Sequence, residues 1–291
     1  MGRDGQSVLE KASKVLECFI RDGRSSLGFV ELLEGTRISR ASLHRTLAEM
    51  TEQGILAQDA RREDYRLGPL LRSAAALAGA STNIPEIARP HMERLRDECQ
   101  ETVVLAELHD LFVVPVSRAD GLHEMRMNQE VGRRYPAHAG ATGKVLVAHL
   151  AEGERRALVD RLELEALTGA TVTDRARLIG ELEEISEIGV AVTLGERVPD
   201  AVAIAAPVFE PHGRAAAALT ISGIASRYEP QRLVTDALAV RRTAAAISAE
   251  LGSPDQGAER SEDEIAEPGS AARLTLQSMC ERAWEGQRAR T

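Results

Sequence analysis

The sequence predicts an α+β protein in two parts: a small head of three helices and a β-hairpin, followed by a larger domain built on an antiparallel sheet. Helical apolar spacing repeats three times before a strand pair within residues 7–68. Strand-like stretches then stand before and after a helical middle within residues 100–251. The length of 291 residues also favours two domains over one.

The first two helices of the head are indicated by a cap and by apolar spacing. Ser7 and Glu10 have the spacing of a capping box, which predicts a helix start. Apolar residues then fall on one helical face as far as Ile20, and Gly23 ends the helix. A short second helix is expected over residues 29–34.

The third helix and the hairpin complete the head. A helix is expected over residues 39–53, because Leu43 and Leu47 belong to one apolar stripe. The segments 55–58 and 65–67 flank a polar turn and predict a β-hairpin. Three helices followed by a hairpin are the element order of a winged helix-turn-helix.

The larger domain alternates between strands and helices. Helices are expected over residues 69–80, 85–99, 141–150, 152–161, 174–188 and 229–251. Strands are expected over residues 102–108, 112–117, 122–127, 191–194, 202–209 and 215–222. Because strands lie on both sides of a helical middle, the sheet is expected to be mostly antiparallel.

The chain is therefore expected to consist of four segments. These are a head over 1–68, a linker helix over 69–83, the larger domain over 84–251 and a tail over 252–291. The tail begins with glycine, serine, proline and acidic residues, a composition typical of a disordered linker. It ends in an amphipathic helix around Trp284 of about four turns at most, which is marginally stable alone.

The charge of the chain is unevenly distributed. A formal net charge of −9 argues against a nucleic-acid binder when the chain is taken as a whole. Residues 1–68, however, hold 11 basic and 11 acidic residues, so the rest of the chain carries the whole excess. A local basic face on a neutral head still attracts phosphate groups.

The third helix carries a face suited to DNA. With Leu43 and Leu47 facing inward, a step of about 100° per residue places Ala41 and Arg45 on the opposite face. The N-terminal part of such a helix enters the major groove, where arginine pairs with guanine and alanine meets a thymine methyl group. The residues predicted to contact DNA are Ser39, Arg40, Ala41, Ser42, His44 and Arg45 of the helix and Arg61, Arg62 and Arg66 of the hairpin. The alternative for this segment is an ordinary solvated amphipathic helix.

Other functional classes lack a motif in this sequence. Cys18, Cys99 and Cys280 form no CxxC pair, which indicates reduced thiols in a cytoplasmic protein. No apolar signal core and no apolar run of about 18 residues occurs, so no membrane association is expected. No histidine pair has metal-ligand spacing and no Gly-x-Ser-x-Gly elbow occurs. We therefore expect no metal, no cofactor and no catalytic residue.

The run from Gly140 to Lys144 is similar to a phosphate-binding loop but departs from that motif. His138 stands at its first glycine position, and Val145 follows the lysine in place of serine or threonine. A tight turn with exposed backbone N–H groups at a helix start is the better interpretation, and such a turn suits a carboxylate. No lysine or arginine is assigned to the predicted site.

Several segments, taken together over residues 7–251, resemble the IclR family of transcriptional regulators. The third helix is similar to the family pattern Leu-Pro-x-Ser-Thr-x-x-Arg-x-Leu. The other matching segments are Tyr65–Gly68, Val131–His138 with Gly143–Lys144, Gly189–Val190, Ala205–Val208 and Ile221–Gly223. The chain departs from the family at Arg37, where glycine is usual, at Ser39, where proline is usual, and at Thr193–Glu196, where an acid-rich stretch is usual.

This resemblance implies a winged helix-turn-helix, a linker helix and a GAF-like effector domain. It also implies a repressor or activator that binds a pseudo-palindromic operator in double-stranded DNA as a homodimer or homotetramer and responds to a small organic effector. The residues implied to line the effector pocket are Met127, Ala141, Thr142, Thr193, Ala203, Thr220 and Ser222.

Two observations leave alternatives open. Thr220 and Ser222 alternate with Ile221, so their hydroxyl groups share one sheet face, which suits a carboxylate effector. Hydroxyl groups paired within the core are the alternative. An enzyme on the α+β domain and a sensor that docks proteins through the Trp284 helix are the rival functional classes.

Overall fold

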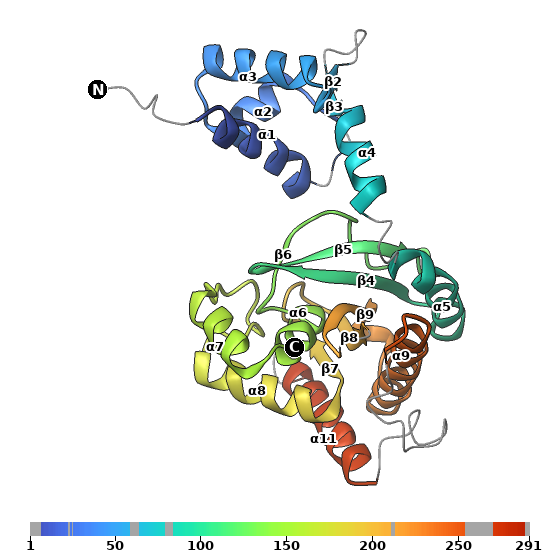
Figure 1. Ribbon diagram of the computed structural model, residues 1–291. Coiled ribbons are helices and arrows are strands. Elements are labelled where there is room, and N and C mark those ends of the chain that lie inside the picture. Colours follow the sequence, from blue (N-terminus) through green and yellow to red (C-terminus); the bar gives the residue numbers. More distant parts are fainter. Residues whose placement is uncertain are drawn as a thin grey trace. The chain divides into compact units, whose positions relative to one another are not determined.

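A computed structural model describes residues 7–22, 24, 26–58, 64–78, 84–210, 213–253 and 270–288 of the chain (Figure 1). Its internal contacts divide the chain into two units, Met1–Asn83 and Ile84–Thr291. Each unit has an apolar core of its own. Among the described helices, none is long and apolar enough to cross a membrane.

The first unit contains three helices, a small sheet and a further helix, as the sequence predicts. The helices are α1 (Val8–Asp22), α2 (Phe29–Thr36), α3 (Arg40–Glu52) and α4 (Pro69–Ala78). The strands are β1 (Ser26–Leu27), β2 (Leu56–Gln58) and β3 (Tyr65–Leu67), in the order β1-β3-β2. Strand β1 was not predicted, because two residues are too few to show an alternating pattern.

Local backbone features set the boundaries of these elements. The backbone N–H of Glu10 donates to Ser7 Oγ at 3.1 Å, which confirms the predicted cap of α1. Arg37 ends α2 in the left-handed region, with φ of 54°. The hairpin closes tightly on Gly68, where a Cβ atom would lie 2.1 Å from the carbonyl oxygen of Gly54. Only glycine fits such a close approach of two backbones.

The second unit is an α+β domain. Its helices are α5 (Ile84–Cys99), α6 (Ala141–Ala148), α7 (Glu152–Arg161), α8 (Arg175–Ile188), the short 3₁₀ helix η1 (Ala225–Arg227), α9 (Pro230–Glu250) and α11 (Ser270–Arg288). Its strands are β4 (Thr102–His109), β5 (Phe112–Ala119), β6 (Tyr135–Pro136), β7 (Ala191–Leu194), β8 (Ala201–Phe209) and β9 (Ala215–Ile224).

The six strands of this unit form one antiparallel sheet in the order β6-β5-β4-β9-β8-β7. Helices α5 and α9 pack together on one side of the sheet, while α6 lies on the other side with α7 and α8 (Figure 1). The core between these layers is built from valine, leucine, isoleucine and alanine, with few aromatic residues. This arrangement confirms the predicted antiparallel sheet.

The predicted strand over residues 122–127 is wrong. That segment forms no ladder, and Tyr135–Pro136 occupies the sheet edge beside β5 instead. Leu122 and Met125, whose apolar character suggested a strand, are 54% and 74% exposed. Since neither residue has a core to face, apolar alternation alone did not distinguish this loop from a strand.

The C-terminal helix α11 is longer than the sequence indicated. It has 19 residues, about five turns, and it contacts α9, β7 and α8. Leu276 and Cys280 are fully buried in the core of the second unit, and Met279 is nearly so. Docking of this apolar stripe supplies the stability that the isolated helix lacks. Most of the predicted acidic linker, residues 254–269, lies outside the described residues.

Candidate DNA interface and effector site

The exposed face of α3 contains four residues of the predicted DNA-contacting set. Arg40, Ala41, His44 and Arg45 are all exposed, while the opposite face packs into the core of the first unit. Ser39 is exposed at the N-cap position, although its hydroxyl group makes no capping hydrogen bond. Two guanidinium groups and a ring nitrogen donor thus lie on one accessible surface, a composition suited to base edges and phosphate.

Ser42 does not belong to this face, which corrects its prediction as a DNA contact. Its side chain is buried, and its carbonyl oxygen accepts a hydrogen bond from Thr46 Oγ1 at 3.0 Å. Ser42 and Thr46 lie beside the apolar positions 43 and 47, so all four form one buried side of the helix.

Phe29, at the start of α2, supports two of the exposed side chains. Its ring centroid lies 4.5 Å from that of His44. The guanidinium carbon of Arg40 lies 5.4 Å from the same ring centroid. These contacts limit the conformational freedom of both side chains, which lowers the entropy cost of ordering them in any complex. Sequence analysis missed Phe29, because a contact between two helices leaves no spacing signal.

The hairpin presents one described arginine of the predicted set. Arg66 is exposed in β3, opposite Ala57 of β2 and Ser26 of β1. Arg61 and Arg62, which were predicted with it, lie outside the described residues. The described part of the hairpin thus places one basic side chain on the surface of the small sheet.

The predicted effector residues of the large sheet lie on one face. Thr193 of β7 is directly opposite Ala203 of β8, which is directly opposite Ser222 of β9. Thr220 lies two residues from Ser222 along β9. Because opposite residues of antiparallel strands share a face, these side chains form one cluster on the same face of the sheet. The expected common face of Thr220 and Ser222 is confirmed.

The first residues of α6 approach the same face. Thr142 Oγ1 lies 3.0 Å from Thr220 Oγ1, within hydrogen-bond distance. The backbone N–H of Ala141 donates to Thr193 Oγ1 at 3.1 Å. Residues from α6, β7 and β9 are therefore brought together as expected, and their hydroxyl groups are paired with one another in this structure.

The segment after β5 also reaches this face. Gln129 is buried, and its side-chain N–H donates to Ser222 Oγ at 3.0 Å. The hydroxyl of Thr102 donates to the carbonyl oxygen of Met127 at 2.9 Å. Gln129 was missed by sequence analysis, since a single glutamine in a loop carries no pattern. Met127 itself is half-buried.

A buried ion-pair cluster lies behind the turn that begins α6. The Lys144 ammonium lies 2.7 Å from Glu181 Oε2 and 2.5 Å from Glu196 Oε1, and Lys144 is almost fully buried. The other oxygen of Glu196 accepts a hydrogen bond from the backbone N–H of Gly140 at 3.0 Å. The first two backbone N–H groups of the turn are thus engaged within the chain. This corrects the expectation that they are free for a ligand.

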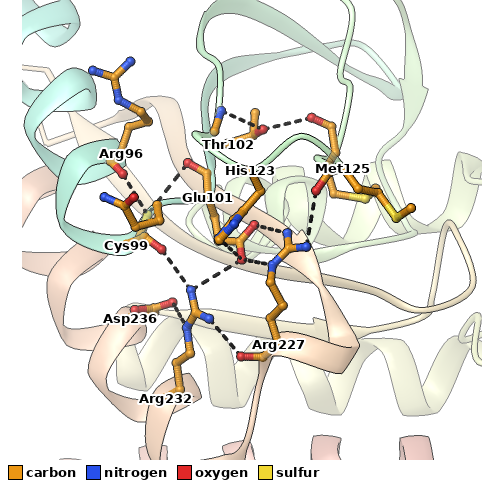
Figure 2. A network of polar contacts seen from close by, with 12 residues as sticks. Arg96, Cys99, Glu101, Thr102, His123, Met125, Arg227, Arg232 and Asp236 are labelled. Carbon is orange, nitrogen blue, oxygen red and sulfur yellow. Dashed lines mark hydrogen bonds and ion pairs between the residues drawn. The ribbon is translucent and has the colours of Figure 1, made fainter.

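A polar network holds the loop after β5 against the end of α5 (Figure 2). The fully buried carboxylate of Glu101 accepts a hydrogen bond from Arg227 Nε at 2.7 Å and lies 3.4 Å from Arg232 Nη2. Arg227 also donates to the carbonyl oxygen of Met125 at 3.3 Å, and Arg232 donates to that of Cys99 at 2.9 Å. One carboxylate with two arginines therefore connects α5, the loop, η1 and α9.

Two other side chains of this network have shifted pKa values. Burial raises the pKa of Asp236 to about 6. Burial also raises the pKa of the Cys99 thiol to about 12, so that this thiol stays protonated and unreactive near neutral pH. The network thus offers no activated nucleophile, and its role is structural.

No group of metal ligands occurs in the part of the chain that the structure describes. His138 is buried, and its Nε2 lies 2.9 Å from the carbonyl oxygen of Glu165, so this histidine braces the loop before α8. The three cysteines are buried and form no disulfide bond with one another.

The first unit is a winged helix-turn-helix whose third helix exposes basic side chains. The second unit is an α+β domain with buried hydroxyl groups between α6 and the sheet. Together these features define a class of DNA-binding regulators. Residues 8–60 match the IclR helix-turn-helix domain, and residues 76–249 match the C-terminal domain of bacterial IclR transcriptional regulators. The chain belongs to the IclR family of transcriptional regulators, which confirms the resemblance seen in the sequence.

Curated relatives span nearly the same region of the chain. The regulator KipR of Bacillus subtilis is 29% identical over 242 residues, which cover 83% of this chain and 96% of KipR. The repressor AllR of Escherichia coli is 27% identical over 252 residues, 87% of this chain and 93% of AllR. Both are named as transcriptional regulators, and the chain is likewise an IclR-type regulator rather than an enzyme.

Solved structures show the same fold. An IclR homolog from Microbacterium hydrocarbonoxydans, crystallised with 4-hydroxybenzoate, has a TM-score of 0.72 and 26% identity, covering 84% of this chain and 99% of that one. The repressor BlcR of Agobacterium tumefaciens has a TM-score of 0.56 and 27% identity, covering 87% and 100%. The predicted fold class is thereby confirmed.

Proposed function

We propose that this cytoplasmic regulator binds a pseudo-palindromic DNA operator as a dimer or a dimer of dimers, and that a small organic effector changes the affinity. The observation that carries the DNA-binding half is the exposed row on α3: Arg40, Ala41, His44 and Arg45. In this proposal residues 1–68 read DNA, residues 69–83 connect, and residues 84–251 bind the effector.

The exposed row suits the major groove. Arg45 lies one helical turn after Ala41, so both side chains reach the same stretch of base pairs. Arg45 forms a bidentate contact with a guanine, and Ala41 packs on a thymine methyl group. Arg66 and the neighbouring arginines 61 and 62 contact the phosphate backbone, which adds affinity without sequence preference.

The effector-binding half of the proposal rests on a cluster of buried hydroxyl groups between α6 and the large sheet. Thr142, Thr193, Thr220 and Ser222 are buried hydroxyl groups whose present partners are other side chains or a backbone N–H group, so a ligand can exchange with those partners. The Microbacterium homolog that was crystallised with 4-hydroxybenzoate supports a small organic acid as the class of effector. Ala203 adds an apolar contact, as is typical of small-molecule pockets.

A gel mobility shift with the DNA that precedes the gene for this protein tests the DNA-binding half. Arg45→Ala is expected to weaken operator binding by about 1–3 kcal/mol, because a bidentate base contact is lost. Arg156→Ala on α7 is a matched control, since its side chain is 74% exposed in the other unit. Unchanged operator affinity in a folded Arg45→Ala protein would contradict the assignment of α3 to the groove.

A further inference from the structure

Arg197 is a half-buried cation that has no acidic partner among the described residues. It follows Glu196 in the loop after β7, and its guanidinium carbon lies 4.2 Å from the ring centroid of Tyr135. Among the described residues, no carboxylate lies within ion-pair distance of Arg197 and no hydrogen bond to its guanidinium is present. Burial lowers the pKa of Arg197, because desolvation disfavours the charged form of the guanidinium group.

The carboxylate that directly precedes Arg197 in the chain already has partners. Both oxygens of Glu196 are engaged, one by Lys144 and one by the backbone N–H of Gly140. The carboxylate of Glu130 lies 3.6 Å from a guanidinium nitrogen of Arg133. Arg133 in turn lies over the ring of Tyr135, the same ring that Arg197 contacts. The positive charge around this tyrosine therefore exceeds the negative charge, within a chain whose net charge is −9.

Arg197 is linked to the buried hydroxyl groups assigned to the effector through Tyr135 and the loop residues 129 and 130. The hydroxyl of Tyr135 accepts a hydrogen bond from the backbone N–H of Glu130 at 3.3 Å. The preceding residue, Gln129, donates to Ser222 Oγ on the large sheet. Tyr135, whose ring contacts Arg197, is thus connected through the consecutive residues Glu130 and Gln129 to the hydroxyl group of Ser222 in the candidate pocket.

We propose that Arg197 is the charge-recognising residue of the effector site and that the effector is a small carboxylate with a flat or apolar body. This inference rests on the proposed function and deepens it. A planar guanidinium donates two parallel hydrogen bonds to a carboxylate, and the Tyr135 ring offers a face for the body of the ligand. Thr220 and Ser222 bind its polar far end.

The backbone turn before α6 is less suited to bind the carboxylate of a ligand than the sequence suggested. Its first N–H group is held by the chain's own Glu196 carboxylate, and its second by Thr193. An incoming carboxylate would have to displace an anion that Lys144 also holds. Arg197 has no such competitor, so the charge of the ligand is recognised on Arg197.

Thermal unfolding of the full chain with paired probes tests the proposal. Each pair is an acid and its neutral amide: 4-hydroxybenzoate with 4-hydroxybenzamide, benzoate with benzamide, and pyruvate with pyruvamide. At least one acid is expected to raise the Tm of the wild-type protein, and its amide is expected to leave the Tm unchanged. In Arg197→Met the dissociation constant of that acid should rise about 10- to 100-fold, because charge-assisted hydrogen bonds are lost.

Two further variants separate charge recognition from folding. Arg197→Lys keeps the charge without the bidentate geometry, and it should retain part of the acid-induced shift. Arg134→Met is the matched control: Arg134 is exposed and lies over the Phe112 ring at 5.2 Å, so the same charge is removed from a similar contact. This control should bind the acid as the wild type does.

Three results would overturn the proposal: amides that stabilise the wild type as well as the acids do, an acid that binds Arg197→Met as tightly as the wild type, or a panel in which no acid binds. The operator mobility shift is measured on the same proteins. Operator binding by Arg197→Met together with loss of the acid response supports the inference. Absence of operator binding by the wild type contradicts the proposed function, whatever the acids do.

Discussion

Single residues in the second unit show two ways of burying a carboxylate. Glu101 is fully buried and receives hydrogen bonds or close ion pairs from Arg227 and Arg232. Asp236 is nearly as buried, yet its Oδ2 lies 3.6 Å from Arg232 Nε and accepts no hydrogen bond within the described part of the chain. Burial disfavours the charged form of Asp236 and outweighs the opposing effects of Tyr228 and Arg232, so the pKa of Asp236 rises to about 6.

This shift predicts a pH dependence of stability. Since the pKa of Asp236 is raised in the folded state, from 3.8 to about 6, the folded protein binds this proton more tightly than the unfolded chain. The stabilisation is complete below about pH 4 and is lost as the pH rises through about 6. Asp236→Asn should therefore increase the free energy of unfolding at neutral pH, by up to about 3 kcal/mol.

Thermal unfolding of both proteins between acidic and neutral pH measures this effect. The stability difference between variant and wild type should grow as the pH rises, because only the wild-type side chain ionises. Asp160→Asn is the control: its side chain is 66% exposed, so its effect should be small at every pH. A difference that is constant with pH would show that Asp236 does not titrate in this range.

Arg37 shows what a single sequence reveals at the residue scale. The sequence marked Arg37 as unusual, because glycine is common at that position in the family it resembles. The structure places Arg37 in the left-handed region, with φ of 54°, where glycine is the least strained residue. By contrast, Phe29, Gln129 and Arg197 were not predicted, because their roles come from contacts with residues far away in the chain.

At the scale of elements, periodic segments were predicted well and short or irregular ones were not. The long helices α5, α8 and α9 and the strands β4, β8 and β9 match their apolar patterns to within two residues at each end. The strand prediction for 122–127 failed because the carbonyl oxygens of Met125 and Met127 accept hydrogen bonds from the side chains of Arg227 and Thr102 and not from a strand partner. Such bonds depend on the folded structure and cannot be read from local spacing.

The C-terminal helix α11 lies beyond residue 249, where the match to the IclR effector domain ends. It packs along β7, the edge strand of the large sheet. Edge strands expose unpaired backbone groups and apolar side chains, and a covering helix protects them. The helix is therefore an integral part of the second unit in this chain.

A pair of leucine variants tests this role of α11. Leu276→Ala should lower the free energy of unfolding of the second unit by about 2–4 kcal/mol, because Leu276 is fully buried. Leu274→Ala, two residues earlier on the same helix, should change it little, since Leu274 is 68% exposed. Equal unfolding temperatures for the two variants would contradict the docking of α11. Operator affinity should be the same in both, because neither residue belongs to the DNA-binding head.

At the scale of the whole molecule, the proposed effector site and the proposed DNA-binding face lie in different units. An effector can change operator affinity only if it binds the DNA-competent and DNA-incompetent states with different affinity. Thr142 joins α6 to the large sheet through the hydroxyl of Thr220, so a ligand that exchanges with this pair alters a contact between layers. The coupling between the two sites should therefore depend on these hydroxyl groups.

Thr142→Val and Ser222→Ala should each reduce the change in operator affinity that an effector causes, while leaving operator affinity without effector intact. Valine keeps the shape of threonine, so the packing of α6 is preserved and only a hydrogen-bonding group is lost. Loss of a buried donor to the ligand costs about 1–3 kcal/mol. The measurement is an operator titration with and without an acid that stabilises the wild type.

Thr243→Val on α9 is the matched control for these variants, because its hydroxyl donates only to the carbonyl oxygen of Ala239 within its own helix. It should respond to the acid as the wild type does. Coupling between two sites is reciprocal, so operator DNA must change the affinity for the acid by the same factor as the acid changes the affinity for DNA. In Thr142→Val both factors should change equally and approach a value of 1, which means no coupling. If both factors in Thr142→Val equal the wild-type values, the effector binds away from the hydroxyl pair that α6 and the sheet share.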